Sequence, residues 1–223
     1  MNRAKGLLFD YGYVAGARAR SVRDGLRPPE FHDGGGAPVL LLPGVFETWH
    51  YLWPIAQRLH SLGHPVYFVQ DLGFNSRAID ESAALVQRFL GERELTGVII
   101  VAHSKGGLIG KHMMGVDDTD GRVLRMIAVN TPFSGSPLAR YAIGKAMREF
   151  HPEHRSVLSL SRDPRVNARI TSIYSEYDQY IPGGSALAGA DNRRLPLVGH
   201  FRPLGHPLLI AEVVARVTEA ERP

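Results

Sequence analysis

Short runs of apolar residues alternate along the chain with longer segments in which apolar residues recur at helical spacing. Most of the short runs lack polar residues at alternate positions, which is typical of strands covered on both faces. These runs predict six strands, at Val39 to Leu42, Val66 to Val69, Val98 to Ala102, Leu124 to Val129, Arg169 to Tyr174 and Arg194 to Val198.

The longer segments predict amphipathic helices, as Leu85, Phe89 and Leu90 illustrate within one of them. We expect these helices at Trp49 to Leu62, Ser82 to Glu92, Lys105 to Met114, Pro137 to Phe150 and Pro207 to Thr218. Strands that alternate with helices form right-handed crossovers and a parallel sheet. The predicted fold is therefore α/β, a three-layer sandwich in which a mostly parallel sheet of about six strands has helices on both faces.

The 223 residues fit a single domain, in which two segments depart from this alternation. Residues 1–38 are basic and rich in Gly and Pro, and we interpret them as an N-terminal extension. Residues 133–168 show no convincing strand but have room for one or two helices, so we expect a small lid there.

The composition excludes several classes of function. The 26 Lys and Arg residues outnumber the 22 Asp and Glu residues, but they are scattered, so we predict no nucleic-acid partner. The chain has no cysteine, which excludes disulfides, thiolate metal sites and Cys nucleophiles. No signal peptide or membrane-spanning segment is visible, which favours a cytoplasmic location, although a secreted chain after processing has the same pattern. Nothing in the pattern indicates an oligomeric state.

The third predicted strand runs into Ala102-His103-Ser104-Lys105-Gly106, where a strand turns sharply into a helix with a serine at the turn. Such a nucleophile elbow needs small residues two positions before and two positions after the serine, as Ala102 and Gly106 are. The Lys105 N–H at the start of the helix is then a predicted oxyanion donor. The alternative is that Ser104 only caps the helix.

A second oxyanion donor is expected after the first strand, where Pro43-Gly44-Val45-Phe46 predicts a glycine turn. The backbone N–H of Val45 is the predicted donor, and that of Phe46 is the alternative. Without a partner serine the same residues would indicate only a tight turn. Paired with Ser104, the turn predicts an oxyanion hole.

A serine nucleophile needs a base and a carboxylate that orients the base, and in this kind of sheet the acid and then the histidine follow the serine in the chain. Asp178 follows the fifth predicted strand and His200 follows the sixth, so we predict them as the acid and the base. Asp71 is another loop acid but precedes the serine, and His206 lies where the last helix begins.

Together these motifs resemble the α/β-hydrolase superfamily, and within it the small bacterial lipases and esterases that lack a large cap. The resemblance covers roughly residues 39–217, and it also rests on Asn130 to Ala139, on the Ser-x-x-Asp-x-x-Ile-Pro pattern around Asp178 and on Gly199-His200. It implies a serine hydrolase without a cofactor, whose partner is a small-molecule ester or lipid substrate.

Two positions depart from the pattern of these relatives. Pro43 stands where they have a histidine that helps to shape the oxyanion turn, so the oxyanion geometry can differ. Lys105 places a cation beside the nucleophile where relatives often carry an apolar residue, which can favour acidic or phosphate-bearing substrates.

Aromatic residues cluster after the oxyanion turn, and we predict that Phe46 and Trp49 line the substrate pocket while most of the cluster is core. His151 and His154 have the spacing of a metal pair, but the proline that follows His151 favours a helix start, so we predict no metal site.

The predicted activity is hydrolysis of carboxylic esters through Ser104, His200 and Asp178. An acyltransferase or thioesterase with the same triad differs only in the acceptor or the leaving group. A hydrolase-like protein that binds an apolar ligand without chemistry is the alternative of a different class. The order of serine, acid and histidine in the chain favours the enzyme.

Overall fold

The computed structural model describes residues 3–161 and 164–221, and its centre is one sheet of six strands. The strand order is β2-β1-β3-β4-β5-β6, and every pairing between neighbours is parallel. The strands are β1 (Val39–Leu42), β2 (Val66–Phe68), β3 (Val98–His103), β4 (Val123–Val129), β5 (Ile170–Tyr177) and β6 (Asp191–Val198). The prediction of a parallel sheet of about six strands is confirmed.

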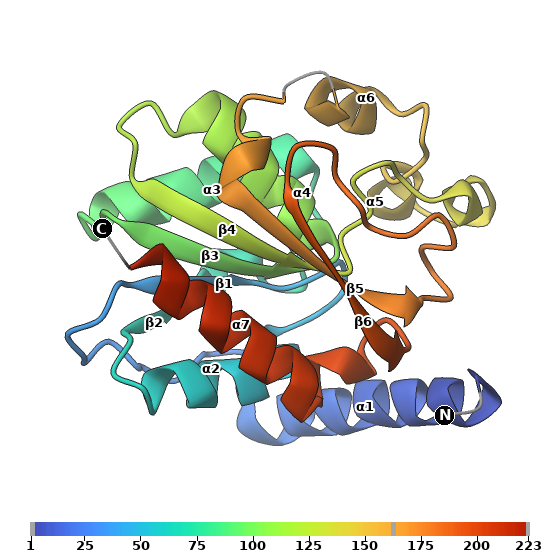
Figure 1. Ribbon diagram of the computed structural model, residues 1–223, viewed down its shortest axis with the longest axis horizontal. Coiled ribbons are helices and arrows are strands. Elements are labelled where there is room, and N and C mark those ends of the chain that lie inside the picture. Colours follow the sequence, from blue (N-terminus) through green and yellow to red (C-terminus); the bar gives the residue numbers. More distant parts are fainter. Residues whose placement is uncertain (1–2, 162–163, 222–223) are drawn as a thin grey trace.

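Helices cover both faces of this sheet (Figure 1). Successive side chains of a strand point to opposite faces. In β3, Ile100 packs in one apolar cluster and Ile99 and Val101 in another, all of them fully buried. The first cluster contains α3 (Ile79–Glu92) and α4 (Lys105–His112), and the second contains α2 (Trp53–His60) and α7 (Pro207–Ala220). The predicted three-layer arrangement is confirmed.

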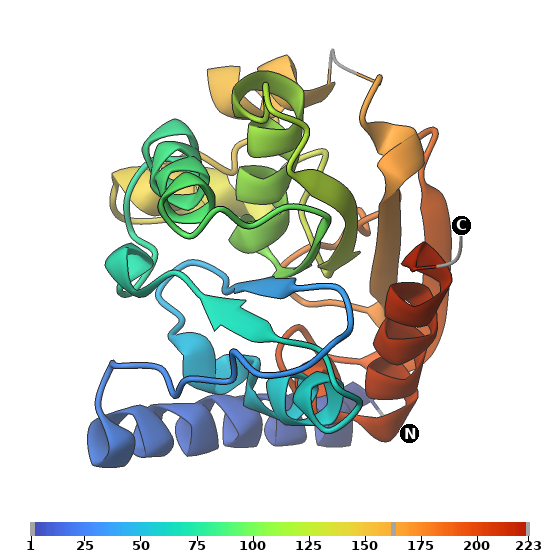
Figure 2. The same ribbon diagram turned by 90° about the vertical axis from the view of Figure 1, so that its left-hand side faces the viewer.

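The N-terminal segment contains a helix of 22 residues, α1 (Arg3–Asp24), which the hydrophobic pattern did not predict. It lies on the α2 and α7 side of the molecule, along the bottom of both views (Figures 1 and 2). Its buried residues are Gly6, Asp10 and Ala17, so the buried face carries no stripe of large apolar side chains. α1 contacts two 3-10 helices, η1 (Trp49–Tyr51) and η6 (Arg202–Gly205).

Two predicted helices are interrupted in the structure. The segment after β1 is divided into η1 and α2, with a proline in the first turn of α2. The predicted helix over 137–150 is divided into the 3-10 helix η4 (Pro137–Tyr141) and the short α5 (Lys145–Arg148), because Gly144 between them has a φ of 95°.

The rest of the expected lid holds α6 (Arg155–Ser161) and the 3-10 helix η5 (Asn167–Arg169), and its described residues contain no strand. Among the helices of the described ranges, none combines the length and the apolar character that are needed to cross a membrane.

Candidate active site

Ser104 lies at the sharp turn between β3 and α4. Its backbone angles, φ 49° and ψ −118°, lie where residues other than glycine are strained. The turn needs Gly106, because an added Cβ there would meet the carbonyl oxygens of Leu42 and Pro43. The Ser104 side chain makes no capping hydrogen bond to α4. The sharp turn from strand to helix that a nucleophile elbow requires is present, and the Ser104 hydroxyl is not engaged as a helix cap.

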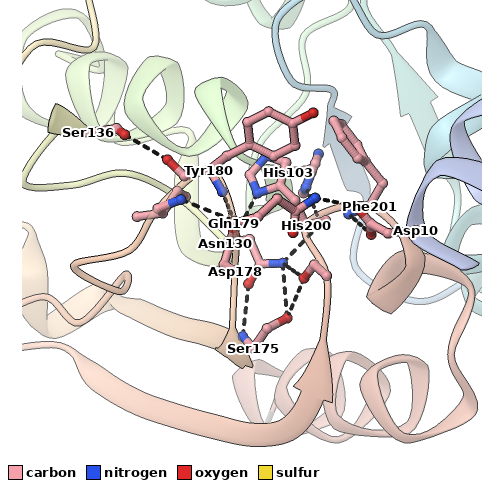
Figure 3. A network of polar contacts seen from close by, with 12 residues as sticks. Asp10, His103, Asn130, Ser136, Ser175, Asp178, Gln179, Tyr180, His200 and Phe201 are labelled. Atoms are coloured by element: carbon pink, nitrogen blue, oxygen red, sulfur yellow. Dashed lines mark hydrogen bonds and ion pairs between the residues drawn. The ribbon is translucent and has the colours of Figure 1, made fainter. Parts of the chain in front are cut away.

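His200 and Asp178 form a close, buried pair at the carboxyl ends of β6 and β5. Nδ1 of His200 lies 2.6 Å from Oδ2 of Asp178. The other carboxylate oxygen, Oδ1, accepts the backbone N–H groups of Tyr180 at 2.8 Å and Ile181 at 3.1 Å (Figure 3). Because Nδ1 is held by the acid, Nε2 is the ring nitrogen that can exchange a proton with a substrate.

The electrostatics of the pair stabilise its charged form. Burial lowers the pKa of His200, but the charge of Asp178 and its hydrogen bond outweigh that effect, and the pKa is raised above the ordinary imidazole value. Burial raises the pKa of the Asp178 carboxyl, but the His200 charge and hydrogen bond and two backbone N–H groups bring it below its usual value. The Asp178 carboxyl therefore stays ionised in the pH range in which His200 titrates.

Ser104 and His200 line one cavity of about 560 Å³, a volume typical of small-molecule sites. Among the described residues, no hydrogen bond joins the Ser104 and His200 side chains, and their proximity is shown by the cavity that both line. Much of its wall is apolar and comes from α1, from the turn after β1 and from the expected lid. The apolar residues from these three segments are Val14, Val45, Phe46, Leu138, Ala139, Ala142, Met147 and Phe150, and Ile181 from the loop after β5 adds to them.

The turn after β1 is held by two buried polar side chains, although Pro43 supplies no histidine there. The Gly44 N–H donates to Oε2 of Glu47 at 2.9 Å, and an added Cβ at Gly44 would meet the same carboxylate. Nδ2 of Asn75 donates to the Pro43 carbonyl oxygen at 2.7 Å. Glu47 and Asn75 therefore fix the backbone of this turn.

The predicted oxyanion donors flank the Ser104 turn. Val45 and Phe46 both line the cavity, and Phe46 is 46% exposed, with a φ of 58°. Within the described part of the chain, the backbone N–H groups of Val45 and Lys105 have no hydrogen-bond acceptor. Both groups are therefore free to donate to a substrate oxygen.

Glu47 also joins the oxyanion turn to the His200 loop through His103, a link that the sequence analysis missed. Nδ1 of His103 lies 2.8 Å and 2.9 Å from the two Glu47 carboxylate oxygens. Its Nε2 lies 3.0 Å from the carbonyl oxygen of His200. A histidine at the end of an otherwise apolar strand was the signal that could have revealed this link.

Asn130, at the end of β4, is a second missed residue. Its Nδ2 donates to the His200 carbonyl oxygen at 2.9 Å, and its Oδ1 accepts the Ser175 N–H at 2.9 Å (Figure 3). It has a φ of 45° and is fully buried. The side chain ties the histidine loop to β5.

The side chain of Lys105 does not line the cavity. Its Nζ is buried and donates to the carbonyl oxygens of Asn75, at 3.1 Å, and of Arg77. Burial lowers the pKa of Lys105 to about 8, against the opposing charges of Glu149 and Glu81. This geometry gives no support to the idea that Lys105 attracts acidic or phosphate-bearing substrates, because the ammonium group is bonded to backbone carbonyl oxygens outside the cavity.

Trp49 and His206 also lie away from the cavity. The Trp49 ring stacks on His50, with 3.6 Å between ring centroids, and packs against Trp53 and Phe68 instead of lining the cavity as predicted. His206 caps α7, because its Nδ1 accepts the N–H of Leu208 at 3.2 Å.

The described residues contain no group of three or more His, Cys, Asp or Glu side chains placed to hold a metal ion. His151 and His154 instead accept backbone N–H groups two residues further along the chain.

Comparison of the sequence with protein-family models and with curated proteins gives no match. Solved structures do resemble this one. An N-formylmaleamic acid deformylase from Pseudomonas putida is 16% identical with a TM-score of 0.60, over 82% of this chain and 93% of its own. The mature lipase of Bacillus licheniformis is 15% identical with a TM-score of 0.61, over 86% and 95%.

An α/β-hydrolase fold protein from Burkholderia ambifaria is 18% identical with a TM-score of 0.59, over 82% of this chain and 92% of its own. At such identities the likeness establishes the fold. This chain has the α/β-hydrolase fold, as its sequence motifs predicted.

Proposed function

We propose that this protein is a serine hydrolase that cleaves carboxylic esters, of the esterase or lipase type. The observation that carries the proposal is the 2.6 Å contact between His200 and Asp178 beside a cavity that also holds the strained Ser104. Nucleophile, base and orienting acid follow the ends of three different parallel strands, which is where this fold places its chemistry.

In the proposed first half-reaction, Oγ of Ser104 attacks the ester carbonyl carbon while Nε2 of His200 takes the hydroxyl proton. The carbonyl oxygen becomes an oxyanion that accepts the N–H groups of Val45 and Lys105. When the tetrahedral species collapses, the C–O bond to the alcohol breaks and His200 returns the proton to that alcohol. An acyl group remains on Ser104.

In the second half-reaction water attacks the acyl carbon, and His200 accepts one of its protons. Collapse releases the carboxylic acid and returns the proton to Oγ of Ser104. Asp178 holds the His200 ring through Nδ1 and stabilises the imidazolium in both halves. Catalytic hydrogen bonds are often long in free enzymes, so we expect the Ser104–His200 bond to form when substrate fills the cavity.

The cavity supports a substrate with an apolar acyl chain. Leu138, Met147 and Phe150 are among the residues of its wall, and the volume of about 560 Å³ accommodates a small ester. One solved neighbour is a lipase by name and another a deformylase, and both names describe hydrolases.

The first test is hydrolysis of p-nitrophenyl esters of rising acyl length. We expect Ser104→Ala to lower kcat by a factor of about 10⁴ to 10⁶ and to leave the fold intact, because only a hydroxyl is removed. Labelling of the native chain by a fluorophosphonate, and its absence in Ser104→Ala, checks the nucleophile directly. Undiminished hydrolysis by Ser104→Ala would end the proposal.

The two histidines provide a matched pair of variants. His200→Ala should lower kcat/KM at least about 1,000-fold, because it removes the base. His206→Ala removes only a helix cap and should cost less than about tenfold. The reverse order would move the base to His206. Comparison with a thioester of the same acyl group measures the preference between ester and thioester. A folded chain that binds the ester but neither hydrolyses it nor reacts with the fluorophosphonate would be a binding protein.

A further inference from the structure

Asp10 is a fully buried carboxylate on α1 that bonds two separate loops of the candidate active site. Its Oδ1 accepts the backbone N–H groups of Phe201 and Arg202, both at 2.7 Å. Its Oδ2 accepts a hydrogen bond from Nε2 of Gln179 at 2.6 Å. Figure 3 shows Asp10 beside Phe201 in the histidine loop, the segment that follows β6 and contains His200.

Two of these bonds reach residues next to the proposed base and acid, and the third reaches Arg202, two residues after His200. Phe201 directly follows His200, and Gln179 directly follows Asp178. One carboxylate therefore fixes the histidine loop through its backbone and the acid loop through a neighbouring side chain. A small displacement of either loop would change the contact between the base and its acid.

The histidine loop is shaped to admit this carboxylate. Gly199 has a φ of 115°, which side-chain-bearing residues rarely adopt. A Cβ added there would meet the Asp10 carboxylate. The glycine before His200 thus allows both the turn and the close approach of α1.

Burying a carboxylate on a helix has a large desolvation cost, which hydrogen bonds to the charged form offset. The hydrogen-bond donors to Asp10 are two backbone N–H groups and the side-chain amide of Gln179, all of them neutral. The neighbouring α1 residues Tyr11, Val14 and Arg18 line the cavity itself. α1 therefore contributes to the site both a wall and an anchor.

We propose that Asp10 is a positioning residue, which keeps His200 and Asp178 in register with Ser104 by tying their loops to α1. The proposal rests on the proposed serine hydrolase function. It predicts that Asp10 acts on the rate of the chemical step and hardly at all on substrate binding.

The test compares two variants of the full chain. Asp10→Ala removes all three accepted hydrogen bonds, and we expect kcat to fall about 10- to 100-fold with KM within about threefold, as for a misplacement of the catalytic groups. Asp10→Asn keeps an oxygen for the two backbone N–H groups, and the Gln179 amide can turn to accept from the new amide. It should restore kcat to within about threefold of the native value.

Tyr13→Phe is the matched control. It removes the 2.6 Å bond from the Tyr13 hydroxyl to the Tyr51 carbonyl oxygen, which anchors the same helix to η1 and makes no bond to the histidine loop or the acid loop. We expect it to lower the melting temperature without changing kcat. An equal loss of kcat in Tyr13→Phe, or an unchanged kcat in a folded Asp10→Ala, would overturn the positioning role.

If Asp10→Ala does not fold, Gln179→Ala decides the question, because it removes only the bond between Asp10 and the acid loop. We expect a kcat loss of about 3- to 10-fold with unchanged KM, and no loss would contradict the proposal. The outcomes separate the two levels of inference. If the native chain has no hydrolytic activity, the proposed function is wrong. If the native chain is active and the Asp10→Ala and Gln179→Ala variants are fully active, only the role of Asp10 is wrong.

Discussion

At the scale of single residues, His200 is held from two sides. Asp178 binds its ring, while His103 and Asn130 bind its backbone carbonyl oxygen. The ring contact with Asp178 sets the proton affinity of His200, whereas the contacts to its carbonyl oxygen fix the position of its backbone. The two sets of contacts can be tested separately.

The ring contact predicts the pH dependence of hydrolysis. In the proposed mechanism His200 acts as the base in its neutral form, and the Asp178 charge raises the pKa of His200. We therefore expect kcat/KM to rise with pH, with its midpoint above the ordinary imidazole value of about 6.5. Asp178→Asn removes that charge, so the midpoint should move to lower pH while the plateau rate falls. A pH profile of kcat/KM for both chains measures this.

Asp191→Asn is the control for that profile, because Asp191 lies at the exposed start of β6 and pairs with Arg193. It should leave the midpoint where it is. A native midpoint at or below about 6.5, or no shift in Asp178→Asn, would contradict the assigned pair.

One of the backbone contacts of His200 is made by His103, whose ring is held in turn by Glu47, so the variant Glu47→Gln tests this side. This change removes the charge that His103 and the Gly44 N–H share, in a place that is almost fully buried. We expect the free energy of unfolding to fall by about 1–3 kcal/mol and kcat to fall with it, because the oxyanion turn loses its fixed backbone. Denaturant unfolding and ester kinetics of the same preparation provide both numbers.

Glu176→Gln is the matched surface control, since Glu176 pairs with Arg194 where both side chains are more than half exposed. It should change the unfolding free energy by less than about 1 kcal/mol. If the two variants lose equal stability, the buried link through Glu47 has no special role.

At the scale of elements, the strands were predictable and α1 was not. Val98 to His103 is buried at every position, and such a run has few alternatives to a central strand. α1 buries a glycine, an aspartate and an alanine, so its buried face leaves no periodic pattern of large apolar residues in the sequence. For the same reason Asp10 could not be singled out, whereas Ser104, Asp178 and His200 could, because strand ends are visible in the pattern.

The segment over residues 133–168 also belongs to this scale, and we propose that it is a mobile lid. α5 has only four residues, and Tyr141 and Ile143 nearby are 71% and 92% exposed. Such short helices are marginal without packing. We expect the amides of residues 137–148 to exchange at least about 100-fold faster than those of β3.

Hydrogen exchange followed by mass spectrometry measures this difference, and α3 is its internal control as a long helix on the same face of the sheet. Exchange over residues 137–148 as slow as in β3 would mean that the segment is a rigid wall.

At the scale of the whole molecule, we propose that residues 1–223 form one domain. Two apolar clusters lie on opposite faces of one sheet, whose strands contribute to both. Unfolding of the sheet would disrupt both clusters at once, so we expect a single cooperative unfolding transition. The two tryptophans lie on one face, because Trp49 packs against the second cluster and Trp53 contacts Trp49 at the start of α2, whereas far-ultraviolet circular dichroism reports helices on both faces.

Denaturation followed by tryptophan fluorescence and by circular dichroism should therefore give coincident midpoints. A separate, earlier fluorescence transition would indicate that the α1 and α2 side unfolds on its own.

The anchoring of α1 also bears on how the protein is made. Asp10 is translated well before its partners Gln179, Phe201 and Arg202, which lie 169, 191 and 192 residues further along the chain. At ordinary ribosomal speeds of about 5–20 residues per second, those partners follow roughly 10–40 seconds later. Throughout that interval Asp10 lacks these three partners, and the loops of the candidate site are completed only after Arg202 has been synthesised. Recovery of activity during synthesis or refolding would therefore report the closing event of folding.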